Sequence, residues 1–221
     1  MGKFKLIAIL FASLSFFACG DDDPINEEQT DPTKIQGHEF VDLGLSVKWA
    51  TCNVGADSSR ERGRHFAWGM PTPLEDEIWE WSDYKFCKGS ATTLTKYCTR
   101  SEYGEVDGKT ILDPEDDPAT VLWGSKWRTP TSIEFKELVD KCEWTNERNG
   151  YTIKGPNGNS IFIPYNGEVK LHLGCGGYWA SDIDDYWNDE AYCISFNSQM
   201  ENTAVCSVIR RDGLSIRPVT P

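Results

Sequence analysis

The sequence predicts an α+β fold, with a single domain of mostly short antiparallel strands and one or two helices. Short runs rich in aromatic and β-branched residues alternate with glycine and asparagine turns over most of the chain. An Asn-Gly turn joins two of these runs, and only one segment has a strong helical period. Few helices among many short strands indicate antiparallel pairing.

The expected strands begin close to residue 38. The Pro-Asn-Gly-Asn sequence at 156–159 favours a hairpin, because Asn-Gly tolerates the positive φ angles of a tight turn. Tyr192, Ile194 and Phe196 alternate with less apolar residues, as in a half-buried strand. The predicted strands span 39–43, 46–50, 65–68, 151–154, 161–164, 178–181, 191–196, 204–209 and 214–219.

Two helices are predicted between the early and the late strands. Thr131 and Glu134 have capping-box spacing, and apolar residues follow at helical intervals, which predicts a helix over 131–141. A shorter helix is predicted to begin at Asp117 and Pro118, because aspartate caps a helix and proline suits its first position.

The N-terminus has the features of an export signal. Lys3 and Lys5 precede an apolar run at 6–17, and this run is shorter than the roughly 20 residues of a transmembrane helix. The segment resembles a bacterial lipoprotein signal, in which 1–18 is removed and Cys19 becomes the acylated first residue. Two or three acyl chains hold a protein stably on its membrane.

A polar tether is expected after the lipidated cysteine, over 19–37. It begins with acidic residues at 21–23, contains two prolines and shows no apolar period, which is typical of a flexible linker. The acidic residues resemble the signal that directs lipoproteins to the outside of the outer membrane in Bacteroides-type bacteria. On chemistry alone a solvated acidic linker is the favoured explanation, and only the resemblance of the whole chain described below shifts the expectation to surface display. The remaining residues, 38–221, are predicted to form one domain.

The charge of the chain limits its partners. Loss of the two signal lysines takes the formal net charge from −13 to −15. Nucleic acids and anionic lipid headgroups are therefore excluded as expected partners, whereas a cation or a neutral glycan would not be repelled.

Seven cysteines remain after Cys19 is acylated, and an export compartment permits disulfides. Cys87 and Cys98 flank a short polar loop, and Cys52 and Cys142 follow two apolar segments. These are the disulfide candidates, although sequence alone does not determine pairing. Buried free thiols are the alternative for each of them.

Nine tryptophans are divided between an expected core and an expected surface. Trp79 and Trp81 lie in an acidic stretch, and with Tyr186 and Trp187 they are the expected exposed aromatics of a ligand-binding surface. The tryptophans expected in the core are Trp49, Trp68, Trp123, Trp127 and Trp179.

Several motifs resemble the major paralogous domain first named from Fibrobacter succinogenes. They are FVDLGL at 40–45, WATCNVGA at 49–56, FAWG at 66–69, WGSKWRTPT at 123–131, GPNGNSIF at 155–162 and SIRPV at 215–219. The resemblance covers nearly all of the chain from residue 38. This family is common among surface lipoproteins of Bacteroides-type bacteria and has no established activity, so the resemblance implies surface display.

A more distant likeness concerns the stretch that begins at Arg128. It is similar to part of the formylglycine-generating, sulfatase-modifying domains, which have a variant C-type lectin fold. The likeness implies a C-type-lectin-like fold in which the first and last strands pair and a long irregular region carries ligand sites. The closely spaced catalytic cysteines of those enzymes have no counterpart, because Cys193 and Cys206 are 13 residues apart.

The loop at 182–190 is the main candidate site. It has five carboxylates, one amide and two aromatic residues, and clustered carboxylate and amide oxygens are the ligands that calcium prefers. A calcium site there would use Asp184, Asp185, Asn188, Asp189 and Glu190. Tyr186, Trp187 and Asn188, together with Trp79 and Trp81, would contact a ligand. The alternative is an exposed acidic loop with one buried tryptophan.

Two further groups of residues were considered as sites and have simpler explanations. The acidic cluster at 113–117 is explained by capping and helix-dipole complementation of the short helix. His172 lies near Cys175 in sequence, but nothing beside them is recognisable as the orienting group of a nucleophile.

The leading hypothesis is a non-catalytic surface lipoprotein whose lectin-like domain binds a glycan or a protein. One alternative is an enzyme of the sulfatase-modifying or hydrolase type, which would lose turnover on replacement of His172 or Cys175. A second alternative is a structural subunit of a surface appendage or envelope complex, which would copurify with a fixed protein partner.

Overall fold

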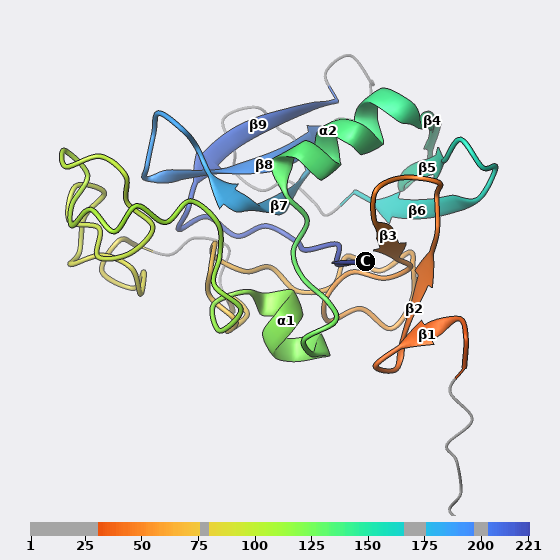
Figure 1. Cartoon of the computed structure of the whole chain (residues 1–221), viewed down its shortest axis with the longest axis horizontal. Helices are drawn as coiled ribbons and strands as arrows, with labels where there is room; N and C mark the ends of the chain where they lie inside the picture. Colours follow the sequence, from red (N-terminus) through yellow and green to blue (C-terminus); the bar gives the residue numbers. More distant parts are fainter. Residues whose placement is uncertain (1–30, 76–79, 166–175, 197–202) are drawn as a thin grey trace, which may run out of the picture. The chain divides into compact units, whose positions relative to one another are not determined.

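The computed structural model describes residues 31–75, 80–165, 176–196 and 203–221. This part of the chain contains two helices and short strands that pair antiparallel, so the α+β prediction is confirmed at this level (Figure 1). Neither described helix is long and apolar enough to cross a membrane.

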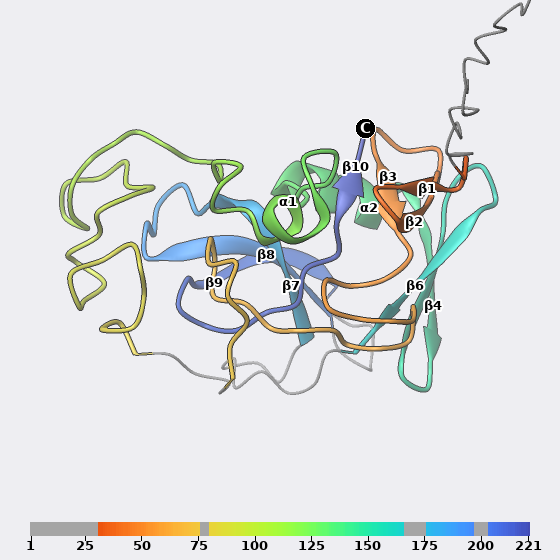
Figure 2. The same ribbon diagram turned by 90° about the horizontal axis from the view of Figure 1, so that it is seen from below.

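The first sheet joins the two ends of the domain. Its strand order is β1-β2-β3-β10, and β10 pairs antiparallel with β3 (Figure 2). The last strand therefore lies in the same sheet as the first ones, although its partner is the third strand. The strands are β1 (Lys34–Ile35), β2 (His38–Val41), β3 (Lys48–Ala50) and β10 (Val219–Thr220).

Residues 51–117 follow β3 and, apart from 76–79, show only turns and isolated bridges in the structure. The two helices come next. Helix α1 (Pro118–Trp123) begins after Asp117, and α2 (Ser132–Lys141) begins with the predicted capping box of Thr131 and Glu134. Both predicted helices are therefore confirmed within one residue.

Two three-stranded sheets complete the described fold. The first has the order β4-β5-β6, from β4 (Glu143–Glu147), β5 (Gly150–Lys154) and β6 (Ser160–Pro164). The second has the order β7-β8-β9, and α2 lies beside it (Figure 1). Its strands are β7 (Gly176–Ile183), β8 (Glu190–Phe196) and β9 (Ala204–Ile209).

Buried apolar side chains form two clusters. One lies among the irregular region, α1 and the β7–β9 sheet, and contains Trp68, Trp123, Trp127 and Trp179. The other lies among β3, α2, the β4–β6 sheet and the β7–β9 sheet, and contains Trp49. All five tryptophans expected in the core are buried, with at most 9% of their surface exposed.

Some predicted elements need correction. The segment at 65–68 forms only a bridge from Phe66 to Leu214, and most of 214–219 is irregular. Strand β4 was not expected, because its sequence is polar and its side chains are mostly exposed. The tether was expected to reach residue 37, but β1 already pairs with β2 through a turn in which Gln36 and Gly37 both have positive φ.

Three of the motifs that resemble the major paralogous domain contribute residues to a buried polar network. Arg217 is fully buried and donates hydrogen bonds to Asn53 Oδ1 at 2.7 Å and to the carbonyls of Ala50, Thr51 and Phe162. Its guanidinium thus joins the end of β3 to β6, which indicates that these motif residues stabilise the fold.

Candidate functional site

The turn between β7 and β8 presents two exposed aromatic side chains. Tyr186 is 70% exposed and Trp187 is 59% exposed. Asp184 is nearly buried, and its Oδ1 accepts hydrogen bonds from the backbone N–H groups of both aromatic residues at 2.8 Å. This Asx-type arrangement holds the backbone under the two rings, as expected of an aspartate that organises a turn.

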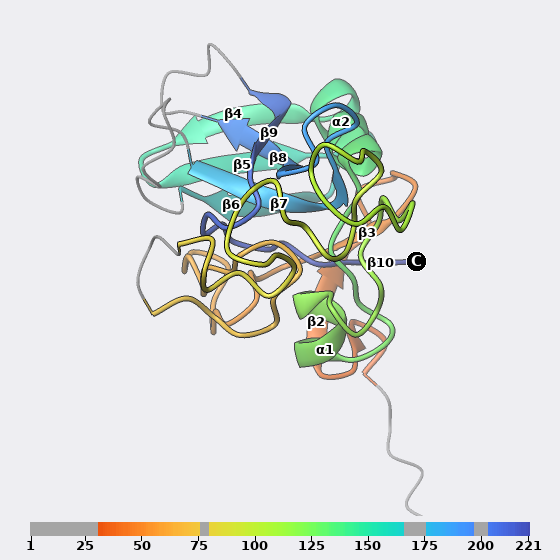
Figure 3. The same cartoon turned by 90° about the vertical axis from the view of Figure 1, so that its left-hand side faces the viewer.

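Asn188 attaches this turn to the irregular region. It is fully buried, and its Oδ1 accepts from Thr99 N at 2.6 Å, Thr99 Oγ1 at 3.0 Å and Arg100 N at 3.0 Å. Its Nδ2 donates to Asp184 O at 3.4 Å. Figure 3, which faces this end of the domain, shows the yellow-green part of the irregular region next to the β7–β8 turn.

The expectation that Asn188 contacts a ligand or a metal is therefore wrong for this structure. Its amide oxygen already accepts three hydrogen bonds and is not accessible from outside. A buried amide whose hydrogen bonds are made within the protein is a structural brace rather than a binding group.

The remaining carboxylates of the loop bind different partners and do not converge on one point. Glu190 Oε2 accepts from Ser207 Oγ at 2.6 Å, and Asp185 Oδ2 accepts from Tyr192 OH at 3.3 Å. Burial raises the pKa of Asp189 above its usual value. These side chains, with Asp184, do not form a group of three whose oxygens converge in the described part of the chain.

Asp182, at the start of the loop, contacts α2. It accepts hydrogen bonds from Ser132 N at 2.8 Å and from Ser132 Oγ. Burial raises the pKa of Asp182, and the two bonds from Ser132 oppose that shift. This carboxylate therefore positions the first turn of the helix.

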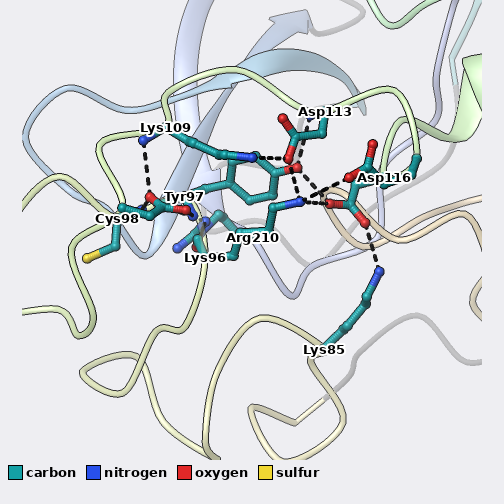
Figure 4. A network of polar contacts seen from close by, with 10 residues as sticks. Lys85, Lys96, Tyr97, Cys98, Lys109, Asp113, Asp116 and Arg210 are labelled. Atoms are coloured by element: carbon teal, nitrogen blue, oxygen red, sulfur yellow. Dashed lines mark hydrogen bonds and ion pairs between the residues drawn. The ribbon is translucent and has the colours of Figure 1, made fainter.

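A second acidic cluster lies in the irregular region around Lys96 (Figure 4). Lys96 Nζ is 2.5 Å from Asp113 Oδ2 and 2.5 Å from Asp116 Oδ2. Lys85 Nζ is 2.7 Å from Asp116 Oδ1, and Lys109 Nζ is 2.5 Å from Asp113 Oδ2. Three lysines from separate turns thus neutralise two carboxylates.

The same cluster is the only group of three potential metal ligands found in the described residues, and it consists of Asp113, Glu115 and Asp116. Lysine ammonium groups already lie where a cation would be attracted. The cluster is therefore explained as an internal ion-pair network.

The lysines and Tyr97 change the titration of Asp116. Burial alone would raise the pKa of this carboxyl, but hydrogen bonds from Lys85, Lys96 and Tyr97 outweigh burial and lower it. Burial would also lower the pKa of Lys96, but bonds to Asp113, Asp116 and Tyr97 raise it. At neutral pH Asp116 and Lys96 are therefore both charged.

The prediction that the 113–117 cluster caps the short helix holds only for Asp117. Its Oδ1 accepts from Ala119 N at 2.9 Å and from Thr129 Oγ1 at 2.7 Å, and its Oδ2 accepts from Thr129 N at 2.8 Å. Asp113 and Asp116 bind lysines instead, because the chain brings these lysines to the cluster from other turns.

Several predicted site residues lie elsewhere or outside the described residues. Trp81 is partly buried, packs against the first core cluster and lies under Arg211, so it is less exposed than expected. The lipidation residue Cys19, the aromatic Trp79 and the pair His172 and Cys175 lie outside the described residues, so their roles stay predictions.

The four disulfide candidates are free thiols in the structure, so the two expected pairs are not formed. Cys87 Sγ donates to Trp81 O at 2.9 Å, whereas Cys98 Sγ donates to Arg100 O at 3.2 Å. Cys52 packs against the first core cluster, and Cys142 packs against the second. The side chains of each expected pair thus have different surroundings.

Sequence reasoning missed the buried role of Asn188 and the pairing of Lys96 with Asp116. The residues that Asn188 binds are 88 and 89 positions away, and Lys96 and Asp116 are 20 positions apart. An asparagine in an acidic stretch is expected to lie on the surface. No local sequence pattern predicts a hydrogen bond between loops that are distant in the chain.

We expect Asn188→Ala to lower the free energy of unfolding by about 2 kcal/mol, because it leaves backbone donors of Thr99 and Arg100 without their acceptor. Urea denaturation measures this difference. The matched control is Asp185→Ala, an exposed position in the same loop, which should change stability by less than about 0.5 kcal/mol. Equal effects of the two substitutions would contradict the bracing role of Asn188.

No family model, curated protein or solved structure matches this chain. The resemblance to the major paralogous domain therefore stays a prediction. The function has to be argued from the geometry of the described residues.

Proposed function

We propose that this chain is a lipoprotein of the bacterial outer membrane, exposed at the cell surface, whose lectin-like domain binds a glycan without catalysis. The export signal ending at Cys19 and the polar tether support anchoring. The motif resemblance supports the lectin-like fold and the surface location. The glycan contact is made by Tyr186 and Trp187.

The observation that carries the glycan proposal is the exposure of these two rings on a turn that the protein braces from beneath. Asp184 holds the backbone of both aromatic residues, and buried Asn188 ties the turn to residues 99–100. Aromatic faces stack on sugar rings, and a turn whose backbone is already held in place loses little backbone entropy on binding. A braced aromatic turn is therefore suited to a neutral, hydroxyl-rich ligand.

The charge of the protein favours the same ligand class. The formal net charge is −13, and carboxylates at 184, 185, 189 and 190 surround the two rings in sequence. Such a site repels anionic ligands, whereas glycan hydroxyl groups can donate hydrogen bonds to carboxylate oxygens.

We expect Trp187→Ala and Tyr186→Ala each to weaken glycan binding about tenfold, which corresponds to about 1.4 kcal/mol. The full chain would be screened against host and plant glycans, and the affinity of each hit would be measured with calcium and with EDTA. The control is Val121→Ala on α1, an apolar side chain that is 48% exposed.

Binding that needs both aromatic residues and is unchanged by EDTA would support a stacking site formed by the protein alone. Loss of binding in EDTA would instead support the calcium site predicted at Asp184, Asp185, Asp189 and Glu190. Binding that survives both aromatic substitutions would contradict the proposed site.

A protein ligand is the second candidate, supported by apolar groups beside Asp182. Ile111 is 53% exposed and pairs with Asp182 by a backbone bridge, and Ile133 is 77% exposed and follows the Ser132 that Asp182 binds. Exposed apolar groups at adjacent elements are typical of protein contacts. A ligand whose binding is lost in Ile133→Asp but retained in Trp187→Ala would favour this alternative.

A further inference from the structure

Cys193 on β8 and Cys206 on β9 lie directly opposite each other in the antiparallel ladder. Their Sγ atoms are 3.2 Å apart. Among the six cysteines of the described residues, no other pair has its sulfur atoms in contact. Opposed residues in an antiparallel pair have Cα atoms about 4.5–5.5 Å apart, within the range of roughly 4.4–6.8 Å that a disulfide requires.

We propose that Cys193 and Cys206 form a disulfide that staples β8 to β9. The two residues are 13 positions apart in sequence, and the connection between them includes 197–202, outside the described residues. The bond would join neighbouring strands of the sheet against which α2 packs, without requiring the backbone to move.

The two thiols differ in solvent exposure, and this difference determines which of them reacts first. Cys193 is fully buried, whereas Cys206 is partly exposed. The hydrogen bond with Cys193, helped by Ser195, lowers the pKa of the Cys206 thiol although burial opposes this shift. The thiolate is the attacking form in disulfide exchange, so Cys206 is the first to react.

The reaction balances as an exchange with an external disulfide such as oxidised glutathione. The Cys206 thiolate attacks one sulfur of that disulfide, which forms a mixed disulfide and releases one thiolate. Cys193 then loses its proton, and its sulfur attacks Cys206 Sγ and displaces the second thiolate. Two protein thiols are oxidised, and the external disulfide is reduced to two thiols.

Three of the other four described cysteines are less suited to this reaction. Cys87 and Cys98 donate to backbone carbonyls, and burial raises the pKa of Cys142 to about 11. A thiol with a raised pKa is mostly protonated at neutral pH and reacts slowly. The proposal therefore predicts a selective bond rather than a mixture of pairings.

The test equilibrates the purified full chain with reduced and oxidised glutathione, blocks remaining thiols and cleaves after glutamate without reduction. Cleavage at Glu190 and Glu201 places Cys175, Cys193 and Cys206 on separate fragments. Mass spectrometry should find the fragment 191–201 linked to the fragment that begins at 202. Absence of this linked pair, or a link from either cysteine to another partner, would overturn the proposal.

A stability measurement tests the staple independently of fragment recovery. Reduction should lower the melting temperature by about 5–10 °C, because a closed loop of this length restricts the unfolded chain. The double variant Cys193→Ala/Cys206→Ala should melt at one temperature with or without reductant, whereas Cys52→Ala should keep the reductant effect. A melting temperature of the wild-type chain that does not respond to reduction would contradict the staple.

Discussion

Arg217→Met is expected to lower the free energy of unfolding by about 3–5 kcal/mol, because it removes four hydrogen bonds from a fully buried site. The acceptors are Asn53 Oδ1 and the carbonyls of Ala50, Thr51 and Phe162, at distances between 2.5 and 3.1 Å. Methionine fills much of the volume but donates to none of them. Urea denaturation of the purified protein measures the loss.

The control for this substitution is Arg148→Met at an exposed position, which should change stability by no more than about 0.5 kcal/mol. Arg217→Lys should fall between Arg217→Met and the wild type, because one ammonium group cannot reach acceptors on both β3 and β6. A loss below about 1 kcal/mol for Arg217→Met would show that the network does not hold these strands together.

Asp116→Asn is expected to lower the free energy of unfolding by about 2–4 kcal/mol at neutral pH. The Asp116 side chain is only 2% exposed and contacts Lys85, Lys96 and the Tyr97 hydroxyl. The neutral amide removes the charge that compensates two ammonium groups. The exposed pair Lys136–Asp140 supplies the control Asp140→Asn, for which a change below about 0.5 kcal/mol is expected.

The pH dependence of this variant follows from the lowered pKa values of Asp113 and Asp116. A carboxyl with a lower pKa when folded contributes stability above its unfolded value of about 3.9, and this stability is lost as pH falls toward the folded value. The wild-type protein should therefore lose stability below about pH 4. The difference between wild type and Asp116→Asn should narrow over the same interval, and a difference that stays constant down to pH 2 would contradict the assignment.

The helices show how much local sequence can determine. The capping box of Thr131 and Glu134 and the Asp117-Pro118 start involve residues within three positions of one another, so both helix starts were predicted within one residue. Tryptophan burial was predicted for a similar reason, since large apolar groups within strand-like motifs have a strong tendency to be buried. Polar strand β4 lacked any such signal and was missed.

The candidate site shows where local sequence is insufficient. Tyr186 and Trp187 were predicted to be exposed and are exposed, whereas Asn188, the next residue, is fully buried. Its burial depends on Thr99 and Arg100, which belong to a distant loop. An asparagine side chain is equally compatible with calcium, solvent or backbone donors, so only its surroundings distinguish these roles.

The α+β class, the two helices, most of the strands with alternating or β-branched patterns and the tryptophan core could be predicted from the sequence. Each depends on residues close together in the chain or on the burial of apolar surface. The bracing role of Asn188, the neutralisation of Asp113 and Asp116 by lysines, the link that Arg217 makes between β3 and β6 and the opposition of Cys193 and Cys206 became visible only in the folded protein. These contacts depend on which distant segments meet, because a buried polar group takes whatever partner the fold brings within hydrogen-bond distance.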